Sequence, residues 1–228
     1  MIYITGDTHG QIKRFSDKKV KKLKKDDTLI VCGDFGFIWD NSNEEQRKLN
    51  ELENKKYNIL FVDGTHENFD LLEQYPVIDF KGSPAHQIAD NIFHLIRGCV
   101  YKVENSKIFA FGGGVSHDLN ILIDQNCWFE QELPNPDEMM FGVTQLRKCK
   151  CKVDYIVTHE PISSIKKRFT SKNMVNDTNR YLDQVFRGVK FDKWFFGSLH
   201  LDKRISDNVF AVFDDVIPAN KVFKPKKK

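Results

Sequence analysis

The sequence predicts an α/β protein in which short strands and helices alternate and pack in layers. Apolar, β-branched runs recur along the chain, each short and bounded by Gly, Asp or Asn. Helical patterns lie between several of these runs. Two of the runs, TLIVC at 28–32 and NILFV at 58–62, are apolar throughout, which is typical of strands that are covered on both faces.

Eight runs are predicted to be strands because they are rich in the residues that favour a pleated sheet. They are Met1–Ile4, Thr28–Cys32, Asn58–Val62, Ile92–Leu95, Lys107–Phe111, Asp154–Thr158, Lys193–Phe196 and Val209–Phe213. A chain of 228 residues suits one large domain. We predict a single domain over residues 1–220, followed by a basic tail over residues 221–228.

Four segments have the apolar spacing that predicts helices: Gln11–Lys25, Glu44–Lys56, Asp137–Cys149 and Asn176–Arg187. In the first, Phe15, Val20 and Leu23, together with Ile12, could form the inner stripe. Residues 112–136 show no clear periodicity, and we expect a long loop with some local structure there.

Charge gives only local signals, because the net charge of +3 is no overall signature of polyanion binding. Lysines gather in Lys13–Lys25 and in Lys224–Lys228. A solvated helix face and a frayed terminus explain these two segments better than a nucleic-acid patch, since no aromatic residues interleave with the tail lysines.

Cysteine usage and the N-terminus predict a cytoplasmic protein. The odd number of cysteines and their spacing form no metal-binding pairs, so we expect free thiols in a reducing compartment. The first residues lack a basic stretch followed by an apolar one, and no secretory signal is predicted. No apolar run reaches the length that crosses a bilayer, so no membrane association is expected.

Polar turns that contain Asp or His follow five of the predicted strands. These turns are Gly6-Asp7-Thr8-His9-Gly10, Gly33-Asp34, Asp63-Gly64-Thr65-His66-Glu67-Asn68, His159-Glu160-Pro161 and Gly197-Ser198-Leu199-His200. In open α/β sheets, ligands bind at the carboxyl ends of the strands. The recurrence therefore predicts that these side chains share one site.

The residue types indicate a divalent transition metal. Residues two apart in extended backbone point the same way, so Asp7 and His9 can bind one ion together. Carboxylate oxygen mixed with imidazole nitrogen suits Mn, Fe, Ni or Zn, whereas a Mg site usually has fewer histidines. Any one of these motifs alone is more often a turn or a satisfied polar pair, but five after five strands favour a metal site.

This ordered set of motifs resembles the calcineurin-like metallophosphoesterase superfamily, whose pattern is GD-x-H, GD, GNH-[ED], a later His and GH-x-H. It looks most similar to small bacterial and phage phosphoesterases, and the resemblance extends from Asp7 to His200. The fold that it implies is a four-layer αββα sandwich, in which two mixed β-sheets are flanked by helices.

The resemblance also implies a role for each matching residue. Asp7, His9 and His200 would hold a first metal, Asp34 would bridge two metals, and His159 would hold the second. His66 would be the general acid, a role that an imidazole can fill near neutral pH. Water activated by the metals would attack phosphorus in line, with Mn as the leading metal and Fe, Ni or Zn as alternatives.

Three positions depart from the family pattern. Thr65 replaces the Asn of GNH and Ser198 replaces the first His of GH-x-H, and both are normally ligands of the second metal. We therefore expect one or two ions with a weak or vacant second site, which Glu160 or water molecules could complete. Phe37 stands where the family often has an Asp that orients the acid histidine, a role that Asp40 or Asp63 could take.

The leading hypothesis is metal-dependent hydrolysis of a phosphate mono- or diester, in which the substrate is a nucleotide, a nucleic acid or a phosphoprotein. A degenerate family member that binds metal, phosphate or nucleotide with little turnover is the alternative, and Thr65 and Ser198 favour it. A nucleic-acid-processing factor that uses Lys13–Lys25 is a third hypothesis. The oligomeric state is not predicted.

Weaker signals concern residues outside the motifs. Arg97 could contact a phosphate, although a structural ion pair is at least as good an interpretation. His117 could line the site, although a polar surface loop is slightly favoured. Trp39, Trp128 and Trp194 are predicted to belong to the core.

Overall fold

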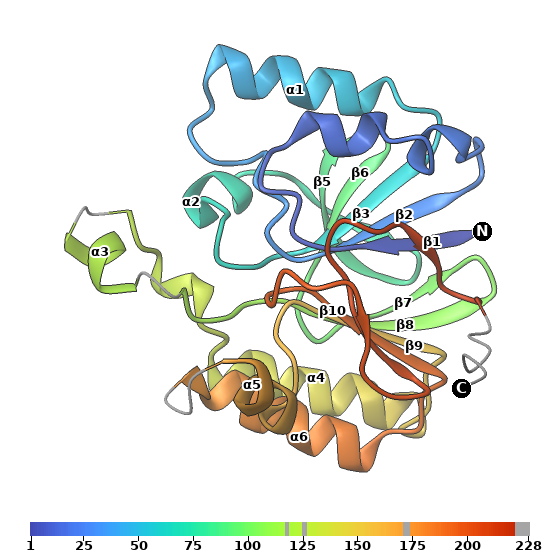
Figure 1. Cartoon of the computed structure of the whole chain (residues 1–228), viewed down its shortest axis with the longest axis vertical. Helices are drawn as coiled ribbons and strands as arrows, with labels where there is room; N and C mark the ends of the chain where they lie inside the picture. Colours follow the sequence, from blue (N-terminus) through green and yellow to red (C-terminus); the bar gives the residue numbers. More distant parts are fainter. Residues whose placement is uncertain (117–118, 125–126, 171–173, 222–228) are drawn as a thin grey trace.

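In the computed structural model, two β-sheets pack face to face and helices cover their outer faces (Figure 1). The structure describes residues 1–116, 119–124, 127–170 and 174–221. His117 and all but the first residue of the predicted basic tail lie outside these ranges. The arrangement of two mixed sheets with flanking helices confirms the expected αββα sandwich.

The first sheet has parallel strands at its centre and antiparallel strands at both edges. Its seven strands, in spatial order, are β13 (Ile217–Pro218), β1 (Ile2–Thr5), β2 (Thr28–Cys32), β3 (Asn58–Val62), β6 (Ile92–Leu95), β5 (Ser83–Ala89) and β4 (Val77–Phe80). The central strands are almost completely buried, as the apolar runs predicted.

The second sheet is also mixed, with β8, β9, β10 and β12 running parallel to one another. Its six strands, in spatial order, are β11 (Lys203–Arg204), β12 (Val209–Ala211), β10 (Lys193–Phe196), β9 (Tyr155–Thr158), β8 (Ser106–Phe111) and β7 (Val100–Val103). Parallel order places the carboxyl ends of β9 and β10 side by side.

The helices lie outside the sheets or in the connections. Above the first sheet in Figure 1 lies α1 (Asn43–Glu53), with α2 (Phe69–Leu72) nearby. Three helices lie below the second sheet: α4 (Pro136–Lys148), α5 (Ser163–Phe169) and α6 (Asp177–Gly188). The remaining helix, α3 (Leu119–Asp124), projects from the body. Asn135 and Asn176 cap α4 and α6 with reciprocal capping boxes, which explains why both begin close to the predicted residues.

Alternation along each strand divides the core into three layers. Leu60 and Val62 point between the sheets, where they pack in one cluster with Val157 and Phe195. Their neighbours on the strands face the helices instead, and Phe61, for example, packs on the α1 side. This division is the expected result of side chains that alternate between two covered faces.

The predicted helix over Gln11–Lys25 is wrong. Two short 3₁₀ helices, η1 (Ile12–Ser16) and η2 (Val20–Lys22), occupy the segment. The chain is extended at Asp17, and the carboxylate of Asp17 accepts a hydrogen bond from the Lys19 amide at 2.7 Å, which competes with helical bonding. The inner stripe is nevertheless buried, as predicted, at Phe15, Val20 and Leu23.

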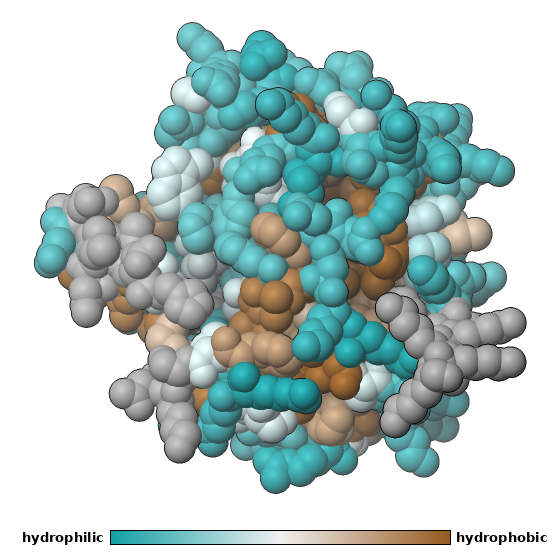
Figure 2. Space-filling view, viewed as in Figure 1, coloured by the Kyte–Doolittle hydropathy of each residue, from teal (hydrophilic) through white to brown (hydrophobic). Residues whose placement is uncertain are grey.

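The loop predicted over residues 112–136 contains α3 and the 3₁₀ helix η3 (Glu130–Glu132). Hydrophilic residues cover most of the upper half of the surface in Figure 2. The lysines within residues 13–25 are all exposed, which agrees with the solvated face expected from the sequence. None of the helices in the described ranges combines the length and the apolar composition that a bilayer crossing requires.

Candidate metal centre

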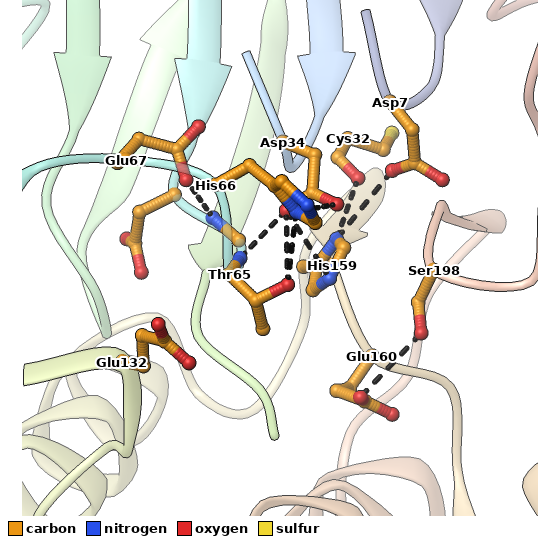
Figure 3. Close-up of polar contacts among 12 residues, drawn as sticks. Asp7, Cys32, Asp34, Thr65, His66, Glu67, Glu132, His159, Glu160 and Ser198 are labelled. Atoms are coloured by element: carbon orange, nitrogen blue, oxygen red, sulfur yellow. Dashed lines mark hydrogen bonds and ion pairs between the residues drawn. The ribbon is translucent and has the colours of Figure 1, made fainter. Parts of the chain in front are cut away.

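Four strand ends bring the five predicted ligands together at one edge of the sandwich. Figure 3 shows three of them, Asp7, Asp34 and His159. Asp7 and His9 follow β1, Asp34 follows β2, His159 follows β9 and His200 follows β10. Their ligand atoms form overlapping groups of three, and within each group all the atoms lie within 4.8 Å of one another. These groups are Asp7, His9 and His200; His9, Asp34 and His66; and Asp7, Asp34 and His159. Two sheets therefore contribute to a single cluster of carboxylate and imidazole groups.

The backbone of these turns is held in an unfavourable conformation. Positive φ angles occur at Asp7 (26°), His9 (45°), Asp34 (45°), Ser198 (62°) and His200 (49°). Non-glycine residues rarely adopt such angles, and each costs on the order of 1–3 kcal/mol unless its surroundings enforce it. Their concentration at one edge of the sandwich is typical of a functional site.

Asp7 is the residue whose contacts point most directly to a cation. Its side chain is fully buried, and neither carboxylate oxygen has a hydrogen-bond partner. The nearest polar groups are imidazole nitrogens, with His159 Nδ1 at 3.5 Å and His200 Nε2 at 3.6 Å. A buried carboxylate without hydrogen bonds is costly, and a bound cation would compensate for this cost.

The distances between donor atoms also fit a metal ion. His9 Nε2 lies 3.0 Å from His200 Nε2 and 3.8 Å from Asp34 Oδ2. Donors at about 2.1 Å from a tetrahedral ion are separated by about 3.4 Å, so these spacings fit ligands that surround one ion. The residues present therefore fit a divalent transition metal.

Asp34 joins the cluster to His66. His66 Nδ1 lies 3.0 Å from Asp34 Oδ2, and the Thr65 amide donates to Asp34 Oδ1 at 2.6 Å. The hydrogen bond to Asp34 outweighs burial and raises the pKa of His66 above its ordinary value of 6.5. Because Nδ1–H is bonded to Asp34, Nε2 is the nitrogen that can exchange a proton with a substrate.

His159 is enclosed between the two buried aspartates. Burial acts to lower its pKa, but the charges of Asp34 and Asp7 outweigh burial and raise it to about 10. Burial in turn acts to raise the pKa of Asp34, but the charge of His159 and the contact with His66 hold it well below its usual range. A positive charge in this position is thus strongly favoured.

Two of the three departures from the family pattern, Thr65 and Ser198, lie on the His159 side of the cluster. The Thr65 hydroxyl lies 3.5 Å from Asp34 Oδ1 and 3.2 Å from His66 Nδ1. The Ser198 hydroxyl donates to Glu160 at 3.4 Å. Both hydroxyls are therefore occupied with protein groups.

Glu160 forms an ion pair with Lys166 and is therefore not available as a metal ligand. Lys166 Nζ donates to both carboxylate oxygens at 2.7 Å, and Asn179 donates at 2.9 Å. Glu160 and Lys166 are each only 1% exposed. The lysine neutralises the carboxylate that the sequence suggested as a replacement ligand.

Two glutamates near the cluster were given no role in the sequence analysis. Buried Glu67 accepts hydrogen bonds from the Phe35 and Gly64 amides at 2.6 and 2.8 Å and so joins the turns after β2 and β3. Buried Glu132 has an oxygen without a hydrogen-bond partner, and burial raises its pKa to about 7. Glu67 lies within the recognised motif, whereas nothing in the irregular stretch around Glu132 marked it.

Arg97 forms a structural ion pair. Its guanidinium is 5% exposed, contacts Asp63 and Glu138, and donates to the Gln131 carbonyl at 2.7 Å. Asp63 also contacts His94 Nε2 at 3.0 Å. The sequence left open whether Arg97 contacts a phosphate or forms a structural ion pair, and these contacts match the ion pair.

Asp40 and Asp63, which the sequence suggested as the aspartates that orient His66, are both bonded to other groups. Asp63 is occupied by Arg97, and Asp40 accepts a hydrogen bond from the Ser42 amide. Asp34 contacts His66 instead.

Of the tryptophans, Trp194 is buried as predicted, but the core prediction for Trp39 is wrong, because it is 36% exposed beside the cluster.

Comparison with known proteins identifies a family for this chain. The sequence model of the calcineurin-like phosphoesterases matches residues 1–201. A search of curated proteins found no significant match. One similar solved structure is the phosphopantetheinyl hydrolase PptH from Mycobacterium tuberculosis, with 16% sequence identity and a TM-score of 0.43 over 93% of this chain and 87% of that one.

Proposed function

Because the chain belongs to the calcineurin-like phosphoesterase family, we propose that it hydrolyses a phosphate mono- or diester with the help of one tightly bound divalent metal. The observation that carries the proposal is the buried Asp7 carboxylate, which lacks hydrogen bonds and lies beside His159 and His200. Asp7, His9, His200 and Asp34 would hold the ion, and their mixed donors favour Mn, with Fe, Ni or Zn as alternatives.

The residues of the site divide the work of hydrolysis. When bound, the ion would supply a water of lowered pKa and positive charge near the phosphoryl oxygens. The phosphoryl group would occupy a pocket of about 460 Å³, which is lined by Asp34, Thr65 and His159, among others. His66, which lines the same pocket, would donate a proton to the leaving oxygen.

A binder with little turnover is the second candidate. The specific observation in its favour is that Ser198 and Glu160 bond to protein groups on the side where a second ion would lie. Loss of the second ion removes the clamp that holds both the attacking and the leaving oxygens. The contact between His66 and Asp34 favours the enzyme, because a pure binder has less need of an oriented acid.

Metal content and turnover test the proposal together. We expect the Mn²⁺-loaded protein to contain about one ion per chain by elemental analysis and to hydrolyse bis(p-nitrophenyl) phosphate. Asp7→Asn should weaken Mn²⁺ binding at least tenfold and abolish turnover, because it removes a charged ligand. Asp27→Asn is the matched control, since Asp27 is a buried carboxylate that pairs with the N-terminal amine instead.

Each outcome separates the candidates. Hydrolysis that depends on Asp7 supports the enzyme. Mn²⁺ binding that depends on Asp7, with no hydrolysis of mono- or diesters, would establish the binder instead. Mn²⁺ binding that is equal in Asp7→Asn and Asp27→Asn would refute the metal centre itself.

A further inference from the structure

A second cleft opens on the other side of His66 and His9. We call it the Trp39 cleft; it has a volume of about 350 Å³ and is lined by Trp39, Asp40, Ser42 and Lys48, among others, as well as by the two histidines. Its size falls in the lower part of the range for small-molecule sites, which is about 300–1,000 Å³. His9 and His66 thus belong both to this cleft and to the pocket over His159.

We propose that the Trp39 cleft binds the leaving group of the substrate and that this group is a nucleoside. The proposal rests on the proposed function, in which His66 protonates the leaving oxygen. A group that receives its proton from His66 must lie beside that imidazole. The pocket over His159 is then left for the phosphoryl group, and the Trp39 cleft is a second space that His66 lines.

Trp39 is an exposed ring that the protein holds in place. Its amide donates to Glu45 at 2.7 Å, and its carbonyl accepts from the Asn68 side chain at 2.8 Å. Its indole packs edge-on against Phe129, with ring centroids 6.4 Å apart and an interplanar angle of 82°. A fixed aromatic ring at the surface of a cleft is suited to stack on a nucleobase.

The charges around the cleft disfavour a phosphorylated or acidic leaving group. Three carboxylates line it, at Asp40, Glu44 and Glu45, and Lys48 in the same lining is paired with Glu44 at 2.8 Å, which leaves an excess of negative charge. Asp40 accepts from the Ser42 amide and is exposed, so its carboxylate can also accept from an amino or hydroxyl group of a ligand. An uncharged aromatic group that donates hydrogen bonds fits these features better than a polyphosphate or an acidic peptide.

The step that follows is an ordinary hydrolysis. The oxygen of water forms a bond to phosphorus, and the bond from phosphorus to the nucleoside oxygen breaks. The nucleoside oxygen takes a proton from His66, and water supplies the proton that restores the imidazolium. Inorganic phosphate or a phosphomonoester and the free nucleoside are the products.

Binding of adenosine alone tests the cleft without turnover. By calorimetry on EDTA-treated protein, we expect adenosine to bind the wild type and Trp39→Phe, and to bind Trp39→Ala about 5- to 150-fold more weakly, the range expected for loss of one stacking contact. Phe186→Ala is the matched control, because Phe186 is 37% exposed, does not line the cleft and should leave adenosine affinity unchanged. Circular dichroism would verify that each variant folds.

Turnover tests the role of the cleft as the leaving-group site. With Mn²⁺, the ratio of kcat/KM for adenosine 5′-monophosphate to that for methyl phosphate should be at least tenfold lower in Trp39→Ala than in the wild type. Hydrolysis of methyl phosphate without adenosine binding would overturn the inference and leave the proposed function intact. Adenosine binding that depends on Trp39, without hydrolysis of any ester, would support the nucleoside site and refute the proposed function. Preference for a phosphoserine peptide over the nucleotide would also overturn the inference.

Discussion

Asp34 is the residue through which most contacts of the site pass. One of its oxygens accepts from the Thr65 amide, and the other lies 3.0 Å from His66 Nδ1. His9 and His159 approach the same carboxylate at 3.8 and 3.7 Å. A single buried carboxylate thus connects the candidate metal ligands with the proposed proton donor, and its hydrogen bond and charge keep the pKa of His66 above 6.5.

Replacement of His66 by Ala should slow hydrolysis most where the leaving group needs a proton. A positioned general acid contributes about 10²–10⁴-fold, so we expect a loss of that size with methyl phosphate. The loss should be smaller with p-nitrophenyl phosphate, because p-nitrophenolate leaves without protonation. Parallel kcat/KM measurements on both substrates check this, and an equal loss on the two would contradict the role of His66 as an acid.

His159 should make the stability of the metal-free protein depend on pH. Its folded-state pKa of about 10 lies above its ordinary value of 6.5, so the protonated imidazole stabilises the folded state. This contribution is complete below pH 6.5 and is lost as the pH rises towards 10. In urea unfolding with EDTA, the difference in unfolding free energy between wild type and His159→Gln should therefore shrink between pH 6.5 and 10. A constant difference would show that His159 is not held as an imidazolium.

The turns after the strands are the elements that build the site, and glycine decides how closely they approach. At Gly64 and Gly197 no positive φ is required, but an added Cβ would lie 2.1 Å from Asp34 Oδ1 and 2.3 Å from Asp7 Oδ1, respectively. These glycines therefore leave room for the carboxylates. The same two turns carry Thr65 and Ser198. We propose that the chemistry of these two side chains, rather than the path of the turns, weakens a second metal site.

Restoration of the family residues in these turns should create a second metal site. In the double variant Thr65→Asn plus Ser198→His, we expect elemental analysis to find about two Mn²⁺ per chain rather than one. Turnover should rise, because the second ion completes the clamp on the reacting oxygens. The two single variants serve as controls and should fall between these limits. If the double variant still holds a single ion, the pair of Glu160 with Lys166 excludes the second metal by itself.

At the scale of the molecule, the site depends on how the two sheets are packed. Asp7, Asp34 and His66 follow strands of the first sheet, whereas His159 and His200 follow strands of the second. The cluster that contains Leu60 and Phe195 fills the space between the sheets. This inner core therefore sets the distance between the two groups of ligands.

Leu60→Ala should weaken metal binding as well as stability. Its side chain is fully buried between the sheets, and loss of a buried Leu side chain costs about 2–5 kcal/mol. Leu52→Ala, in α1 on the outer face of the first sheet, should cost a similar amount of stability, since Leu52 is also fully buried. We expect only Leu60→Ala to lower Mn²⁺ affinity in titrations of the folded variants. Equal Mn²⁺ affinities in the two variants would contradict the dependence on inter-sheet packing.

Local sequence was sufficient for the central strands and for the turns that follow them, because a short apolar run that ends in Gly, Asp or His is a signal within a few neighbouring residues. It was insufficient for the edge strand β4 and its neighbour β5, which are only partly buried, and for Gln11–Lys25, where Asp17 ends the first turn.

The partners of charged and aromatic side chains were decided by tertiary contacts alone. Lys166 neutralises Glu160, Arg97 joins Asp63, and Trp39 borders a cleft instead of the core. Arg97 and Asp63 are 34 residues apart, so their pairing depends on which distant segments meet. Glu160 and Lys166 are close in sequence, but the fold decides that both side chains are buried. Burial and charge pairing are properties of the folded chain, so no pattern of neighbouring residues could contain them.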